Sequence, residues 1–140
     1  MSHVVAGAGT ERAKSLFERT LDRSFNTAHL LTASVRQAEA AVLKAIDWFD
    51  PNLETEEGLF RHALRAAVEI PPEWELGSAV RALPAELQAV LNLTRELRHC
   101  FVLRVLIGMS RQACGELLGL NVQKVDESTF TAMRRLAGFT

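Results

Sequence analysis

The most informative pattern in the chain is residues 110–131, SRQACGELLGLNVQKVDESTFT. Ser110 is a residue type that begins helices, and Gly119 is one that ends them. A small residue, Gly115, lies four positions before Gly119, and Val125 lies six positions after it. A helix, a tight left-handed turn that glycine adopts at little cost, and a second helix packed through Val125 would explain this spacing. The pattern predicts a helix-turn-helix, with a plain antiparallel helical hairpin as the alternative.

Helical patterns continue outward from this motif on both sides. The second helix of the motif extends to about Leu136, and apolar spacing indicates further helices at about 84–91 and 95–107. In the first half, apolar residues recur at three- and four-residue steps in three stretches, about 10–31, 35–49 and 55–69. No stretch keeps the strict alternation of a half-buried strand. We therefore predict an all-α protein.

The composition excludes several classes of protein. With 48% hydrophobic residues and a formal net charge of −1, the chain of 140 residues is neither intrinsically disordered nor uniformly basic. Its two cysteines cannot form the disulfide framework of a small secreted protein. The sequence has no apolar run long enough to span a membrane, and its first ten residues lack the pattern of a signal peptide. We expect a cytoplasmic protein without membrane contact.

The sequence divides into two helical regions. Prolines and a glycine interrupt the middle of the chain, so we expect a helical region at 1–69, a linker at 70–83 and a helical domain at 84–140. Charge follows the same division, because acidic residues outnumber basic ones in the first half. Residues 94–140 carry seven basic and four acidic side chains. The C-terminal region is therefore the only basic part, and only mildly so.

A longer pattern surrounds the helix-turn-helix. Residues 97–110, LRHCFVLRVLIGMS, are followed by LLGLNV at 117–122 and by Val125. This combination resembles region 4 of the bacterial sigma-70 family, and most closely that of the extracytoplasmic-function sigma factors. In that family, region 4 reads the promoter −35 element with a helix-turn-helix and packs on the flap of RNA polymerase. The resemblance implies a helix-turn-helix domain of winged-helix-like type in the C-terminal region.

The resemblance extends into the N-terminal half. Residues 25–49, with AHLL at 28–31 and AE at 38–39, are similar to region 2 of the same family, and residues 59–68 correspond to its closing helix. In the family, region 2 docks on the clamp helices of the polymerase and opens the promoter −10 element. The resemblance implies a shortened and divergent sigma-factor-like protein whose partners are the RNA polymerase core and promoter DNA.

The resemblance also implies which residues contact DNA. The helix that begins near Val122 is expected to lie in the major groove. The candidate DNA-binding residues are Arg111, Gln112, Asn121, Gln123, Lys124, Arg134 and Arg135. Where the family favours basic residues, this chain has Asp126 and Glu127. Acidic side chains weaken binding to phosphates, although they can accept a hydrogen bond from a cytosine amino group.

Two functions remain open at this point. The first is transcription initiation or regulation, with binding to RNA polymerase and to promoter DNA. The second is a degenerate sigma-like interaction module that has lost promoter reading and binds polymerase, another regulator or a second copy of itself. The family resemblance favours the first function, and the acidic pair 126–127 favours the second.

Other candidate sites have simpler interpretations. Cys100 and Cys114 fall on apolar helix faces, where a free thiol behaves as a small hydrophobic group. We expect His99 to be exposed and therefore predict no metal site. The acidic cluster 54–57 fits a helix N-terminus, which attracts carboxylates for electrostatic reasons. Because the sequence has no phosphate-binding glycine loop and no nucleophile motif, we expect neither an enzyme nor a cofactor.

Overall fold

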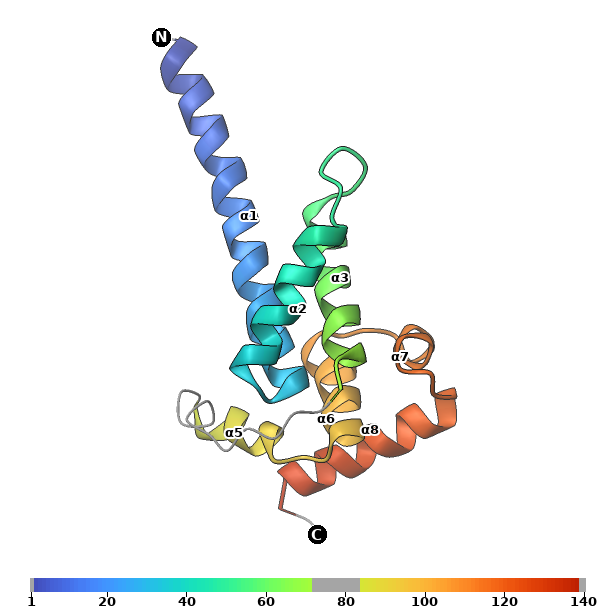
Figure 1. The fold of residues 1–140 in the computed structure, drawn as a ribbon. Helices are drawn as coiled ribbons and strands as arrows, with labels where there is room; N and C mark the ends of the chain where they lie inside the picture. The colour runs from blue at the N-terminus through green and yellow to red at the C-terminus, as the bar shows by residue number, and fades with distance from the viewer. Residues whose placement is uncertain (1, 72–83, 139–140) are drawn as a thin grey trace.

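The structure is a computed structural model that describes residues 2–71 and 84–138, with side chains from residue 16 onward. Its elements are α1 (Ser2–Thr32), α2 (Val35–Trp48), α3 (Glu56–Glu69), α5 (Ala85–Leu91), α6 (Arg95–Phe101), the π-helical segment η1 (Val102–Leu106), α7 (Arg111–Leu118) and α8 (Val122–Leu136) (Figure 1). None of the described residues lies in a strand, which confirms the all-α prediction. The winged-helix-like detail is wrong for these residues, because a wing is a β-hairpin. Most of the expected linker, residues 72–83, lies outside the described ranges.

The helix boundaries in the first half follow local chemistry. The Ser34 hydroxyl accepts a hydrogen bond from the backbone N–H of Gln37 (3.1 Å), so Ser34 begins α2. Ala33, with a positive φ of 58°, separates α2 from α1. The expected helix start near Thr10 is wrong, because α1 already begins at Ser2. Glycines precede Thr10, and glycine weakens a helix without blocking it as proline does.

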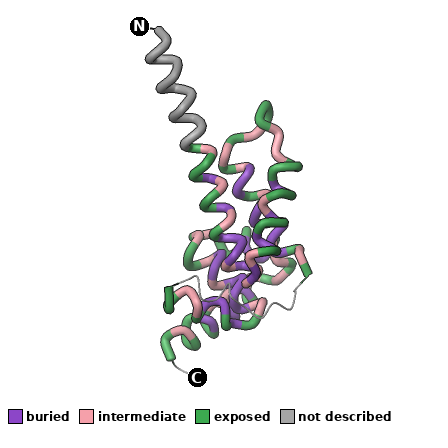
Figure 2. Tube along the Cα trace, turned by 60° about the vertical axis from the view of Figure 1, so that its left-hand side comes forward, coloured by how far each residue is buried: buried purple, intermediate pink, exposed green. Residues whose placement is uncertain are grey.

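Both halves of the chain contribute to one hydrophobic core. Leu31 and Phe60 from the first half are buried in the same cluster as Leu103 and Val125 from the second half. Figure 2 shows the buried residues concentrated where the helices of both halves meet. Two smaller clusters lie within single halves, one around Leu59 and one around the side chains of α6 and α8. The two regions are therefore packed together rather than joined only by a linker.

Polar contacts from α6 close the C-terminal end of α1. The Nε atom of Arg98 and the Nε2 atom of His99 each lie 3.0 Å from the backbone carbonyl oxygen of Leu31 and donate to it. Arg98 Nη1 also donates to the carbonyl of Leu93 (3.0 Å). The expectation that His99 is exposed is wrong, since only 4% of it is accessible. The last carbonyls of a helix have no partners within it, and these two side chains supply them.

A second arginine of α6 closes α3 in the same way. Arg95 Nη2 donates to the carbonyl oxygens of Val68 and Ile70, at 2.8 Å each. From the other side, the Gln37 amide donates to the carbonyl of Pro71 (2.6 Å). Cations at helix C-termini also interact favourably with the helix dipole. Helix α6 therefore joins the ends of α1 and α3 to the C-terminal half. No helix in the described ranges is both long enough and apolar enough to cross a membrane.

Candidate nucleic-acid interface

The turn between α7 and α8 has the geometry that the sequence predicts. Gly119 ends α7 with a left-handed φ of 71°, and the N–H of Leu120 donates to the carbonyl of Gly115 (2.9 Å). A Cβ atom on Gly115 would lie 2.6 Å from the Leu120 carbonyl oxygen, so only glycine permits this approach. Val125 is fully buried on the inner face of α8.

The two helices cross steeply instead of forming an antiparallel hairpin. Figure 1 shows α7 nearly along its axis, while α8 runs across the view. Capping side chains fix both N-termini, because Ser110 accepts from the N–H of Ala113 (3.1 Å) and Asn121 from the N–H of Lys124 (2.7 Å). This arrangement leaves the side of α8 that faces away from the core open to a partner.

The helical period divides α8 into an inner and an outer face. Val125, Ser128 and Ala132 are buried, whereas the exposed side chains on the opposite face are Gln123, Glu127, Phe130 and Arg134. Phe130 is 61% exposed, and the Arg134 guanidinium carbon lies 5.7 Å from its ring centre. Phe130 is the feature of this face that the sequence analysis did not identify. Its position opposite Val125 in the helical period was the available signal.

The seven candidate DNA-binding residues are all exposed, but they fall into two groups. Five lie at the N-terminal ends of α7 and α8: Arg111, Gln112, Asn121, Gln123 and Lys124. Arg134 and Arg135 lie in the last turn of α8, about ten residues later, which corresponds to roughly 15 Å along a helix. The contact between Arg111 and Asp126 joins the N-terminal ends of the two helices, and the second group lies at the far end of α8.

Arg111 and Lys124 both form ion pairs with acidic side chains of the same chain. Arg111 Nη1 lies 2.9 Å from Asp126 Oδ2, and both side chains are about half exposed. Lys124 Nζ lies 3.7 Å from Glu96 Oε2, which also accepts a hydrogen bond from Ser128 (3.4 Å). Glu96 belongs to α6, so its role at this site could not be read from the sequence around α8.

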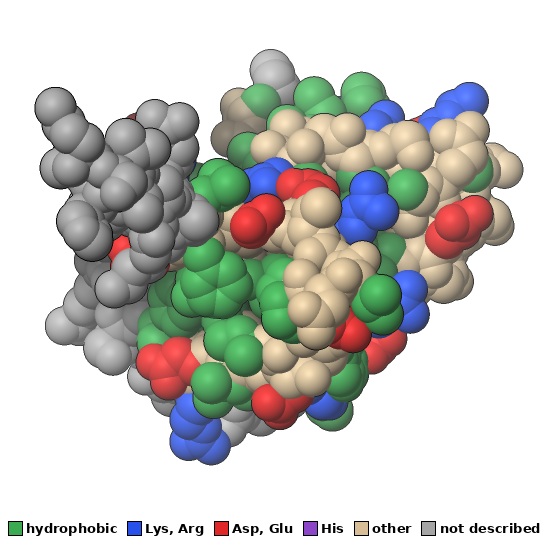
Figure 3. Space-filling view, turned by 90° about the horizontal axis from the view of Figure 1, so that it is seen from above, with side chains coloured by type: hydrophobic (Ala, Val, Ile, Leu, Met, Phe, Trp, Pro, Cys, Tyr) green, Lys and Arg blue, Asp and Glu red, His purple; other side chains and the backbone are tan. Residues whose placement is uncertain are grey.

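The side-chain amide of Gln123, on the outer face of α8, also has a partner in the same chain. Gln123 Nε2 donates to Glu127 Oε1 at 3.3 Å. The three carboxylates in these contacts, those of Glu96, Asp126 and Glu127, outnumber the two cations, Arg111 and Lys124. Phosphate binding, in contrast, depends on an excess of cations. Mixed charge is not confined to this site, because basic and acidic side chains are also interspersed on the face of the molecule in Figure 3.

The two cysteines lie together in the core. Cys100 and Cys114 are fully buried with free thiols that contact each other. The hydrogen bond to Cys114 and burial both raise the pKa of the Cys100 thiol, so it stays protonated and unreactive at neutral pH. Within the described ranges, no three histidine, cysteine or acidic side chains are grouped closely enough to hold a metal ion.

Comparison with known proteins adds no family to these observations. No protein-family model matches the chain, and no curated protein matches its sequence. The resemblance to sigma regions 2 and 4 therefore rests on the residues quoted above.

Proposed function

We propose that this protein is a sigma-factor-like transcription regulator that binds RNA polymerase and presents α8 to promoter DNA. The observation that carries the proposal is the open outer face of α8, set by the glycine turn and the steep crossing of α7. A helix held in this way fits the major groove, which admits one α-helix. The residues that resemble sigma region 4, 97–110, 117–122 and Val125, include the glycine turn and the start of α8.

Within this proposal, the two groups of candidate residues have different roles. Gln123, at the first turn of the outer face, is placed to contact base edges, while Arg111 and Lys124 contact phosphates on either side of it. Arg134 and Arg135, at the far end of α8, reach the DNA backbone beyond the groove contact. Polymerase binding involves both halves of the chain, as the resemblance to regions 2 and 4 implies.

The carboxylates near the turn make polymerase part of the DNA-binding step. Asp126 and Glu96 hold the two cations that would otherwise neutralise phosphates. Free protein is therefore expected to bind DNA weakly. Once polymerase binds both the protein and the promoter, the DNA contact becomes intramolecular, and a weak contact is enough at a high effective concentration.

The first test is binding to bacterial RNA polymerase core, by interferometry and gel filtration. We expect a dissociation constant below about 1 μM, which corresponds to roughly 8 kcal/mol. Promoter-length duplex should then bind to the complex more tightly than to the free protein. A protein that is folded by circular dichroism and does not bind core would contradict the proposal.

A second candidate function is an interaction module that does not read DNA. The observation that favours it is Phe130, a large aromatic side chain that is 61% exposed on the outer face, which also carries Glu127 hydrogen-bonded to Gln123. Exposed aromatic and arginine side chains are typical anchors of protein interfaces. Substitution of Phe130 by alanine separates the two functions. It should abolish partner binding if α8 is a protein contact, and leave the salt dependence of DNA binding unchanged if α8 lies in the groove.

A further inference from the structure

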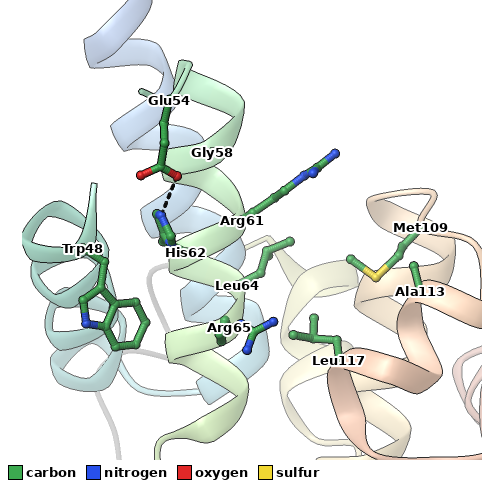
Figure 4. A pocket seen from close by; sticks show the side chains of 10 residues that line it. All are labelled: Trp48, Glu54, Gly58, Arg61, His62, Leu64, Arg65, Met109, Ala113 and Leu117. Atoms are coloured by element: carbon green, nitrogen blue, oxygen red, sulfur yellow. Dashed lines mark hydrogen bonds and ion pairs between the residues drawn. The ribbon is translucent and has the colours of Figure 1, made fainter. Parts of the chain in front are cut away.

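A groove of about 810 Å³ lies between the N-terminal helices and the helix-turn-helix. Helix α3 forms its floor with Gly58 and Leu64, Trp48 at the end of α2 forms one wall, and Leu117 of α7 forms the other (Figure 4). Both halves of the chain are needed to build it. Its volume is in the range of pockets that bind small molecules, about 300–1,000 Å³.

The groove has an apolar surface that is continuous with the core. Leu64 is buried at its base, and Figure 4 shows its side chain directed toward Met109 and Leu117. Ala113 lines the same wall from α7 with a small side chain that leaves the space open. Trp48 remains 41% exposed, although its ring is large and apolar. An apolar body seated here would remove this surface from water.

Two cations of α3 border this apolar surface. Arg61 and Arg65 are exposed and one helical turn apart, and both line the groove. Among the described side chains, neither makes an ion pair or a hydrogen bond. Figure 4 shows both guanidinium groups on the side of α3 that faces α7. They differ in this from Arg111 and Lys124, whose charges are already paired.

Glu54, the acidic side chain that lines the groove, already has two partners within the protein. Glu54 Oε2 lies 2.7 Å from His62 Nε2, and Glu54 Oε1 accepts a hydrogen bond from the backbone N–H of Asp50 (3.0 Å). The backbone hydrogen bond, with the contact to His62, lowers the pKa of the Glu54 carboxyl. The groove therefore has unpaired positive charge beside an apolar surface, and both carboxylate oxygens of Glu54 already have partners within the protein.

We propose that this groove binds a small organic anion with an apolar body, namely an aliphatic or aromatic carboxylate. The carboxylate contacts Arg61 and Arg65, and the apolar body lies between Trp48 and Leu117. Guanidinium groups suit carboxylates because their planar donors match two carboxylate oxygens. The proposal does not depend on the function of α8, since it concerns the opposite side of α7.

Ligand binding at this place would hold the two halves of the chain together. A molecule that touches both α3 and α7 binds only when these helices are docked, so it stabilises the docked state by mass action. Because α7 is the first helix of the helix-turn-helix, the ligand would fix the orientation of that motif relative to α1–α3.

Trp48 provides a direct signal for the test. The chain has two tryptophans, and the substitution Trp74→Phe, outside the described ranges, leaves Trp48 as the single emitter. This protein is titrated with decanoate and with phenylbutanoate, both below their micelle concentrations, and with decyltrimethylammonium as a cation of equal chain length. We expect saturable changes in Trp48 emission with at least one of the two acids, and at least about tenfold weaker binding of the cation. The two acids distinguish an aliphatic from an aromatic ligand.

Two variants test the proposed contacts. Arg61→Gln with Arg65→Gln should weaken binding of the acid about tenfold or more, whereas Arg19→Gln with Arg36→Gln removes the same charge from exposed positions outside the groove and should not. Ala113→Phe adds bulk to the α7 wall without removing a charge and should block binding. The proposal is overturned if neither acid binds up to millimolar concentration, if the cation binds equally well, or if the arginine pair and its control lose affinity equally in folded proteins.

Discussion

Arg98 and His99 are buried beside backbone carbonyls and have no carboxylate partner among the described residues. Burial, with the nearby charge of Arg95, lowers the pKa of Arg98 to about 10, which leaves it protonated at neutral pH. Burial first, and then the charges of Arg98 and Arg95, lower the pKa of His99 to about 4, so His99 is neutral in the native protein. The carbonyl of Leu31 receives one charged and one neutral donor. This pair is a structural junction between the halves and is sensitive to acid.

The neutral state of His99 predicts a loss of stability in mild acid. The unfolded chain takes up a proton at this position as the pH falls below about 6.5, whereas the native protein takes it up only near pH 4. The contribution of neutral His99 to the free energy of unfolding is therefore fully present above pH 6.5. It decreases as the pH falls toward 4, by about 3 kcal/mol in all. Urea unfolding at several pH values measures the effect. His99→Gln should flatten the curve over this interval, and parallel curves for the two proteins would contradict the assignment.

The paired cations at the turn lead to a prediction for DNA. Asp126→Asn releases Arg111, and Glu96→Gln releases Lys124, without a large change in side-chain size. Each substitution should strengthen binding to duplex DNA. Each released cation should steepen the slope of the logarithm of the binding constant against the logarithm of the salt concentration by about one. Fluorescence anisotropy at several salt concentrations measures both. Glu18→Gln, on the exposed side of α1, makes the same charge change as a control. Equal gains in the control and the test variants would show that only net charge matters.

Sequence reasoning located the candidate residues but not their partners. That Asp126 and Glu127 would oppose DNA binding follows from their positions in the helix after the turn. The contact between Lys124 and Glu96 does not follow, since these residues are 28 positions apart and belong to different helices. The burial of His99 was also missed, because the end of α1 that covers it is remote in sequence.

At the scale of elements, helix ends were the most predictable features because local chemistry sets them. Ser34, Ser110 and Gly119 end or begin helices where the sequence indicates. The π-helical segment η1 was not predicted. Its N–H of Ile107 bonds to the carbonyl of Val102, five residues earlier (2.9 Å), and places both Val102 and Leu103 in the core. The burial of these two side chains depends on tertiary packing, which a local sequence pattern does not describe.

The two glycines of the turn should respond differently to alanine. Gly115→Ala brings a Cβ within 2.6 Å of a backbone oxygen, so the turn must move, at a cost of about 1–3 kcal/mol. Gly119→Ala meets no atom within 4 Å and costs only the left-handed conformation, about 1 kcal/mol. Urea unfolding at pH 7 should give this order. Gly108→Ala, which also has a positive φ and no atom within 4 Å of the added Cβ, is a control for the left-handed conformation and should cost about as much as Gly119→Ala. An equal loss at Gly115 and Gly119 would mean that the turn relaxes freely.

At the scale of the whole molecule, the two regions share one hydrophobic core. The sequence predicted the regions, but the shared core that contains Phe60 and Leu103 could not be predicted, because no motif specifies how two amphipathic bundles dock. Arg95 adds to this docking by closing α3 from the other half. In the proposed function, in which both regions contact polymerase, this packed arrangement is the state from which binding would start.

Because the core is shared, we expect a destabilising substitution in one half to shift the urea unfolding transition of the other half. In the Trp74→Phe protein, Trp48 emission reports the N-terminal half in urea, and labelling of the buried thiols of Cys100 and Cys114 reports the C-terminal half. We expect the two transitions to coincide. Leu103→Ala removes a fully buried side chain from the C-terminal half and should cost about 2–5 kcal/mol. Because its cluster includes residues of α1 and α3, the Trp48 transition should shift as far as the thiol transition.

The reciprocal variant completes this prediction. Leu59→Ala removes an equally buried side chain from a cluster formed by the N-terminal half alone. If the molecule is one cooperative unit, thiol labelling should move to lower urea together with Trp48 emission, even though no thiol touches that cluster. Two separate regions give a different result, because Leu59→Ala would then shift only the Trp48 transition and Leu103→Ala only the thiol transition. That separation would mean that the carbonyl contacts of Arg95, Arg98 and His99 break before either half unfolds.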